Sequence, residues 1–322
     1  MELLKKLTEC NSVSGDEKEI RELIELEAKK YAYDIRTDAL GNLIVHKKGT
    51  GKKLMMTAHM DEIGIIVTFV EDDGFIRFSK VGGLYTNDLI GRRVRFKNGT
   101  VGVIGLDGEA KDRTLQKMFI DIGAKDKKSA EKMVKIGDTA CFMGEFVVQG
   151  EKIISKALDD RVGCYILLEA LKNCEESKND LYFVFTVQEE VGLRGAKTSA
   201  FGIMPDMAIA IDVTDTGDTP KSDVMEVKLG AGAAIKVMDS SCICSPEVRS
   251  LLLELARKNK IPCQIEVLTY GGTDAGAIHL TGAGVKTGGV SIPTRFIHSP
   301  SEMVDADDVK ACIRLVEQFC YA

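Results

Sequence analysis

The chain has 322 residues, of which 44% are hydrophobic and 29% charged, proportions that indicate a folded globular protein rather than a disordered or membrane-embedded one. The 43 basic and 49 acidic side chains leave a net charge of −6, and with no tryptophan and only 6% aromatic residues the composition argues against a nucleic-acid-binding protein. Because a single hydrophobic core stops growing near ~250–300 residues, we expect two domains or one domain with a sizeable insertion.

The N-terminal sequence MELLKKLTECNSVSGDEKEI has neither the long apolar segment nor the small-residue cleavage site of a signal peptide, and it predicts two short helical stretches. Ser14 and Glu17 fit a capping box at the start of a helix expected at about 15–31. Strands are expected next at 42–47, 53–58 and 63–70.

The middle of the chain, at 67–156, is a succession of short strands separated by turn signals. Asn98-Gly99, between RVRFK and TVGVIG, is the strongest of the short hairpin signals. One helical stretch is expected near 128–134. We therefore expect a small β domain of 67–156 inserted into the rest of the chain.

After this segment, helical and strand patterns alternate. Helices are expected at 159–173, 193–200, 246–260, 274–280 and 306–321, and strands at 181–187, 207–213 and 264–269. Continuously apolar strands between amphipathic helices predict an α/β fold with a mixed, largely parallel sheet that carries helices on both faces. The predicted α/β domain is discontinuous, comprising 1–66 and 157–322.

The nine cysteines show no framework spacing and lie mostly in apolar runs, which is typical of buried thiols in a reducing compartment. Cys242 and Cys244 are separated by one residue, too close for a usual zinc hook, and are expected to be structural. No run approaches the ~18 apolar residues needed to cross a bilayer. These features predict a cytoplasmic protein without a membrane partner.

Acidic side chains and histidines follow several of the predicted strands. The stretches are AHMDE (58–62), LDDR (158–161), QEEVG (188–192), AIDVT (210–214) and IHSP (297–300). In open α/β sheets, ligands bind at the carboxyl ends of strands, so we expect these side chains to lie close together.

Each stretch also has an ordinary structural explanation, such as a polar turn, a helix cap, a solvated glutamate pair or a single structural histidine. Considered together, they offer two imidazoles and three carboxylates, one of which can bridge. Two zinc-like cations about 3.5–4 Å apart need such a set, and they activate a water molecule for hydrolysis.

The same stretches, together with GGTDAGAIHLTGAG and IPTRFIHSPSEMV, resemble metallopeptidase family forty-two, the tetrahedral aminopeptidases. The resemblance extends over essentially the whole chain, with every motif in order. It implies that Asp159 bridges two divalent metal ions, that His59 and Asp212 complete one site, and that Glu190 and His298 complete the other.

By the same resemblance, Glu189 is the general base that takes a proton from water and delivers it to the leaving amine, and Asp61 supports the site from behind. The family also has a cis peptide bond at the position of Asp159–Asp160. The implied metals are zinc or cobalt, with manganese also compatible. The inserted β domain is implied to mediate homo-oligomerisation into a hollow dodecamer.

The predicted function is therefore a metal-dependent aminopeptidase acting on peptides with a free N-terminus. Other binuclear hydrolases, namely carboxypeptidases, deacetylases and dipeptidases, remain alternatives, as does a glycosidase that uses Glu189 in an acid/base pair. Asp274 could shape the site or cap a helix, and Arg295 could bind a substrate carboxylate or brace His298. His46 and His279 are expected to be structural.

Overall fold

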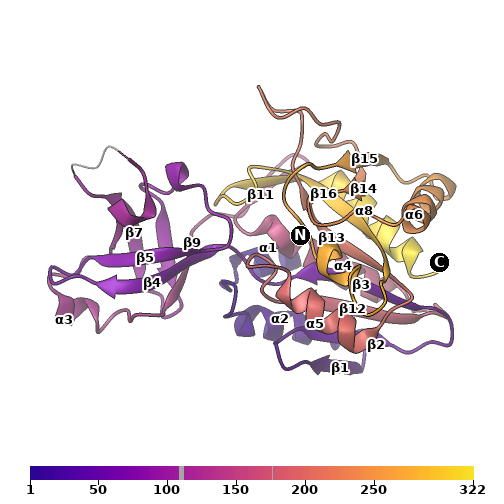
Figure 1. Cartoon of the computed structure of the whole chain (residues 1–322), viewed down its shortest axis with the longest axis horizontal. Coiled ribbons are helices and arrows are strands. Elements are labelled where there is room, and N and C mark those ends of the chain that lie inside the picture. Colours follow the sequence, from indigo (N-terminus) through magenta and orange to yellow (C-terminus); the bar gives the residue numbers. More distant parts are fainter. Residues whose placement is uncertain (109–111, 176) are drawn as a thin grey trace.

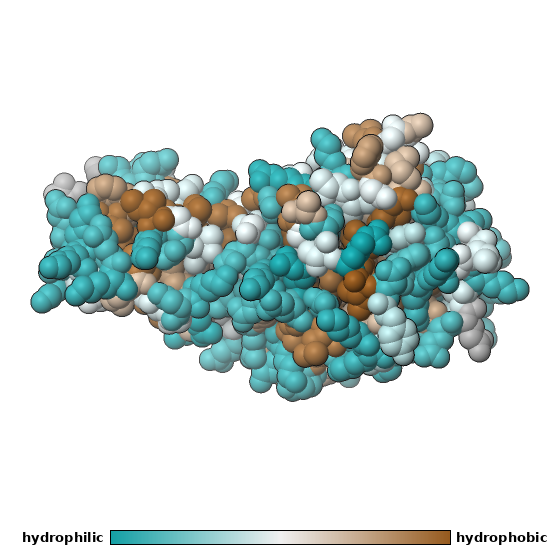
Figure 2. All heavy atoms as spheres, turned by 90° about the horizontal axis from the view of Figure 1, so that it is seen from below, coloured by the Kyte–Doolittle hydropathy of each residue, from teal (hydrophilic) through white to brown (hydrophobic). Residues whose placement is uncertain are grey.

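The computed structural model describes residues 1–108, 112–175 and 177–322. They form an α/β body from which a small β-barrel projects on one side (Figure 1). The surface seen in Figure 2 is mostly hydrophilic, with apolar side chains gathered in separate small areas. Among the described helices, none combines the length and the apolar run required to cross a bilayer.

The α/β body is built on an eleven-stranded sheet with the order β1-β2-β12-β3-β13-β16-β17-β11-β10, in which β14 pairs with β15 and β16. The strands are β1 Asp34–Thr37, β2 Leu43–Lys47, β3 Lys53–His59, β10 Val147–Gln149, β11 Lys152–Ser155, β12 Asp180–Thr186, β13 Met207–Thr214, β14 Ala233–Met238, β15 Cys263–Val267, β16 Lys286–Arg295 and β17 Glu302–Asp305. The sheet is mixed, as predicted. However, "largely parallel" is correct only for the central strands β12, β3, β13 and β16 and for the β14–β15 pair, because the outer strands pair antiparallel.

Helices cover both faces of this sheet. They are α1 Glu2–Glu9, α2 Lys18–Ala28, α4 Leu158–Asn173, α5 Arg194–Ile203, α6 Pro246–Lys258, α7 Ala275–Ile278 and α8 Ala306–Phe319. Strand side chains alternate between faces. Leu54 and Met56 in β3 therefore join the core beneath α4 and α8, whereas Met55 between them packs with Ala200 of α5 and Ile278 of α7.

The barrel is closed in the order β4-β5-β8-β7-β6-β9 and has a hydrophobic core of its own. Its elements are β4 Gly64–Val70, β5 Ile76–Val81, β6 Arg93–Phe96, β7 Val101–Leu106, β8 Met118–Asp121, β9 Thr139–Phe142 and the short helix α3 Lys127–Ala130. Asn98-Gly99 connects β6 to β7, which pair antiparallel as the hairpin signal predicted. The structure places the boundaries of the insertion elsewhere than the predicted 67–156. The barrel begins with β4 at Gly64, and β11, which lies within the predicted range, hydrogen-bonds to β17 of the large sheet.

The capping box predicted for the second helix is wrong. Helix α2 begins at Lys18, and in the part of the chain that the structure describes no side chain caps its N-terminus. The Ser14 hydroxyl instead donates a hydrogen bond to Asp61 (2.6 Å), and the Glu17 carboxylate accepts hydrogen bonds from the backbone N–H groups of Gly15 and Gln188. Both side chains therefore connect the N-terminal segment to residues next to the predicted site.

The longest strand of the sheet, β16, was not predicted, because its sequence KTGGVSIPTR contains strand-breaking residues. The structure explains two of them. A Cβ on Gly288 would lie 2.7 Å from Val248 of α6, and a Cβ on Gly289 would lie 3.0 Å from the Cβ of Lys236 on β14. Glycine thus allows α6 and β14 to approach this strand closely.

A buried cluster of charges joins the start of the barrel to α1 and α4. The Glu62 carboxylate lies 2.7 Å from the Lys156 ammonium and 3.4 Å from Arg161, and all three side chains are buried. Arg161 also donates to the backbone carbonyls of Leu7 and Cys10. The cluster therefore fixes the N-terminal helix against α4.

Removing the single anion of this cluster should destabilise the fold. We expect Glu62→Gln to lower the free energy of unfolding by about 3–5 kcal/mol, because Lys156 and Arg161 would stay buried without a counter-charge. As a control, Glu25→Gln breaks the surface pair with Lys29, whose partners are both partly or fully exposed, and should cost under about 1 kcal/mol. Urea unfolding of both variants measures the difference, and similar losses in the two would contradict this account.

Candidate metal centre

The five predicted ligands lie together at the carboxyl edge of the central strands. His59 is the last residue of β3, Asp212 lies near the end of β13, and Glu190 follows β12. Asp159 is at the start of α4, and His298 follows β16. The spatial grouping of these residues is as the sequence indicated.

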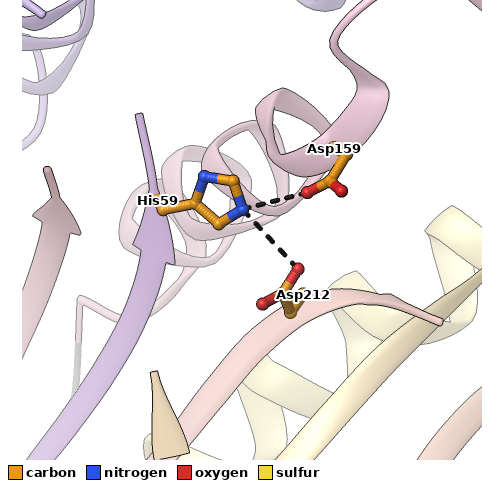
Figure 3. Close-up of side chains that lie close together, drawn as sticks. All are labelled: His59, Asp159 and Asp212. Carbon is orange, nitrogen blue, oxygen red and sulfur yellow. Dashed lines mark hydrogen bonds and ion pairs between the residues drawn. The ribbon is translucent and has the colours of Figure 1, made fainter. Parts of the chain in front are cut away.

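One group consists of His59, Asp159 and Asp212, whose ligand atoms all lie within 4.8 Å of one another (Figure 3). His59 Nε2 is 2.9 Å from Asp159 Oδ1 and 3.8 Å from Asp212 Oδ1. The other ring nitrogen, Nδ1, lies 3.1 Å from the backbone carbonyl of Asp61. With Nδ1 donating to that carbonyl in the neutral ring, the Nε2 lone pair would be free for a cation.

The second group consists of Asp159, Glu190 and His298. His298 Nε2 is 3.4 Å from Asp159 Oδ2 and 3.2 Å from Glu190 Oε2. Asp159 therefore presents one carboxylate oxygen to each group. Glu190 Oε1 is buried and has no hydrogen-bond partner among the described residues, which is costly unless a positive group lies against it.

Asp61 holds the turn after β12 that carries the two glutamates. Its carboxylate accepts hydrogen bonds from the backbone N–H groups of Glu189 (3.0 Å) and Glu190 (3.2 Å) and from the Ser14 hydroxyl. The residue before them, Gln188, has a left-handed φ of 55°, a conformation that needs such support. Asp61 is in neither ligand group; besides these backbone contacts, its Oδ1 lies 3.6 Å from His59 Nδ1.

Glu302, which was not predicted, supports the backbone of two proposed ligands, Asp159 and His298. Its two carboxylate oxygens accept hydrogen bonds from the backbone N–H groups of Asp159 (2.9 Å) and His298 (3.0 Å). The carboxylate of Asp160 likewise accepts hydrogen bonds from the backbone of His59 and Gly163. In the sequence, Glu302 lies in an ordinary-looking polar turn, so no pattern distinguished it from an exposed residue. The peptide bond between Asp159 and Asp160 is cis, as expected.

Glu189 lies beside both groups without belonging to either. Burial raises the pKa of Glu189 well above its ordinary value, and the carboxylates of Asp212 and Glu190 add to this rise. Asp274 lies near it and accepts a hydrogen bond from the Thr186 hydroxyl (2.6 Å). Asp274 occupies the N-cap position of α7, but among the described residues its side chain makes no capping hydrogen bond; burial raises its pKa to about 6.

The site holds more carboxylates than positively charged groups, and this shifts the pKa values of its side chains. Burial raises the pKa of Asp212 well above its ordinary value, and the Asp159 carboxylate contributes. Burial alone would lower the pKa of both histidines, but their carboxylate neighbours raise the pKa of His59 well above normal and that of His298 to about 12. Divalent cations would relieve this repulsion, and they prefer ligands of these types.

The site opens into a cavity of about 610 Å³ between the α/β body and the barrel. Lys80, Leu84 and Tyr85 from the barrel line it together with Asp215 and Tyr270 from the α/β body. A cavity of this size can enclose the end of a peptide.

The remaining candidates have structural contacts. Arg295 donates to the Asp218 carboxylate (2.7 and 3.1 Å), so its described contacts are neither to a ligand site nor to His298. His46, on β2, lies between Asp34 of β1 and Asp180 of β12, and His279 contacts the backbone carbonyl of Ala275 in the preceding helical turn. All nine cysteines are free thiols.

Comparison with known proteins is consistent with this geometry. Residues 41–315 match the family described as M42 glutamyl aminopeptidase. A relative from Acetivibrio thermocellus is 55% identical and is matched over 99% of this chain and 98% of its own length. The lysyl aminopeptidase of Pyrococcus furiosus is 37% identical over 98% of this chain and 95% of its own. The TET1 peptidase of Pyrococcus horikoshii, which assembles into a tetrahedron or a large octahedral shell, superimposes with a TM-score of 0.90 at 38% identity, covering 99% of this chain and 98% of that one.

Proposed function

Because the chain belongs to the M42 glutamyl aminopeptidase family, and so to the peptide-bond hydrolases, we propose that it removes the N-terminal residue from peptides with the help of two divalent metal ions. The observation that carries this proposal is the Asp159 carboxylate, whose two oxygens face two separate groups of ligands. Amide hydrolysis needs an activated nucleophile, stabilisation of the oxyanion and a proton shuttle.

The residues fit a pair of cations. His59 and Asp212 would hold one ion, Glu190 and His298 the other, and Asp159 would bridge them. The buried, unpartnered oxygen of Glu190 and the crowded carboxylates support this assignment. Zinc, cobalt and manganese are all compatible with this ligand set. Bound there, the ions would polarise the scissile carbonyl and lower the pKa of a water molecule.

Glu189 would move the proton. Its raised pKa suits a group that accepts a proton from water at neutral pH and then passes it to the departing amine. Asp61 would fix the position of Glu189 by accepting the hydrogen bond from its backbone N–H. Glu302 would keep Asp159 and His298 in place in the same manner.

The substrate would be a peptide with a free, protonated N-terminus. A buried site with several carboxylates attracts an ammonium group. A carboxypeptidase would need a cation to receive the C-terminal carboxylate, and the lysine that lines the cavity, Lys80, is exposed to water, which weakens such a contact. We also propose that the barrel mediates homo-oligomerisation, as the TET1 peptidase assembles from many copies of a similar chain.

Matched peptides test the direction of attack. The metal-loaded enzyme should release the N-terminal residue from a free-amine peptide, while the same peptide with an acetylated N-terminus should be cleaved at least about a hundredfold more slowly, because the acetyl group removes the charge. Cleavage of both peptides at similar rates, or release of the C-terminal residue, would contradict the proposal.

A further inference from the structure

The cavity contains two charged side chains that belong neither to the proposed metal ligands nor to the proposed base. Among the described lining residues these are Asp215, just past the end of β13, and Lys80, on β5 of the barrel. Lys80 is exposed, whereas Asp215 is partly buried. A charge shielded from water interacts more strongly with a partner than an exposed one does, so Asp215 has the larger potential effect on a bound substrate.

Asp215 is held with one oxygen free. The Tyr270 hydroxyl donates a hydrogen bond to Asp215 Oδ2 (3.1 Å), which fixes the orientation of the carboxylate. Within the described part of the chain, Oδ1 receives no hydrogen bond, and no lysine, arginine or histidine forms an ion pair with Asp215. Burial raises the pKa of Asp215, and the Asp159 carboxylate adds to this, so a positive group brought into the cavity would stabilise the ionised form.

The position of Asp215 along the strand separates it from the reaction centre. Asp215 is three positions after Asp212, which corresponds to about 10 Å along an extended strand. The α-ammonium group of a substrate lies next to the scissile carbonyl and must stay near the proposed metal ligands. A side chain with a four-carbon stem, as in lysine, can span the remaining distance.

The cavity wall also includes apolar side chains that suit such a stem, those of Leu268 and Leu193. Apolar side chains can pack against the methylene groups of a long basic residue while its charged end reaches a polar partner.

On the premise that the proposed aminopeptidase function is correct, we propose that Asp215 binds the positively charged side chain of an N-terminal lysine or arginine, and that the enzyme therefore prefers basic N-terminal residues. The family description and the lysyl aminopeptidase relative differ in the residue they name, so membership of the family does not decide this preference.

Lysine and norleucine provide the matched pair of substrates, because norleucine has the same stem without the charge. With the metal-loaded full-length enzyme, we expect kcat/KM for the lysyl anilide to exceed that for the norleucyl anilide by about tenfold or more. Asp215→Asn should lower kcat/KM for the lysyl substrate by about tenfold to a hundredfold and change the norleucyl value less than about threefold. Asp223→Asn removes a nearby charge that is outside the cavity lining, and it should change the lysine-to-norleucine ratio much less than Asp215→Asn does.

A binding measurement makes the test independent of turnover. Calorimetric titration with L-lysine and L-norleucine should show tighter binding of lysine to the wild type, and Asp215→Asn should abolish this difference. Equal losses for both substrates in Asp215→Asn, or a wild-type preference for glutamyl over lysyl substrates, would overturn the proposal. If no substrate is cleaved but lysine still binds through Asp215, the proposed aminopeptidase function fails while the binding site stands.

Discussion

Glu189→Gln is expected to lower kcat by about a hundredfold to ten-thousandfold, because glutamine cannot accept the proton that must leave the attacking water. Glutamine has nearly the same size, and the backbone hydrogen bond from residue 189 to Asp61 does not depend on the side chain. The variant should therefore fold normally. Steady-state kinetics on a free-amine peptide measures the loss.

The metal content of this variant separates a base from a ligand. Since the Glu189 carboxylate lies outside both ligand groups, Glu189→Gln should retain two cations per subunit. Glu190→Gln provides the matched control, because the same change in the neighbouring residue removes a proposed ligand and should lower the metal content. Activity of Glu189→Gln within about tenfold of the wild type would exclude the assigned role.

Asp159→Asn should have the largest effect of any single substitution in the site. The amide has one oxygen, so it can no longer present a carboxylate oxygen to both His59 and His298. We expect loss of at least one cation per subunit and activity at the level of the background. Elemental analysis of the purified variant, together with the peptide assay, checks both expectations.

His46→Gln is the control for Asp159→Asn. His46, on β2, also lies between two carboxylates, those of Asp34 and Asp180, but it is not among the residues that line the cavity. Its replacement should leave metal content and peptide hydrolysis unchanged. Retention of both cations by Asp159→Asn would show that this residue does not bridge them.

The sequence was most informative where local pattern and tertiary environment agree. The apolar runs that became β3, β12 and β13 were predicted within one or two residues, since strands buried on both faces have few alternatives. The strand β14 was not predicted, because Lys236 interrupts its apolar pattern. In the structure the buried Lys236 pairs with the carboxylate of Asp239, in the following turn, and with that of Glu266, which is 30 residues away in the sequence.

For the site too, local patterns predicted some features, whereas others depend on contacts between distant residues. Acids and histidines at strand ends are visible in the sequence, and topology brings those ends to one edge of the sheet. The supporting contacts were not predictable: Glu302 binds two backbone groups, one of them in a residue 143 positions away, and Ser14 binds Asp61 instead of capping a helix. Arg295 pairs with Asp218 across a 77-residue separation, which no local pattern indicates.

The most direct test of the central claim is to titrate the metal-free, full-length protein with Zn²⁺, Co²⁺ or Mn²⁺ while following release of the N-terminal residue from a free-amine peptide. We predict that release rises from the background and saturates when two cations are bound per subunit. Equally rapid release before any metal is added, or no release after two cations are bound, would contradict the account.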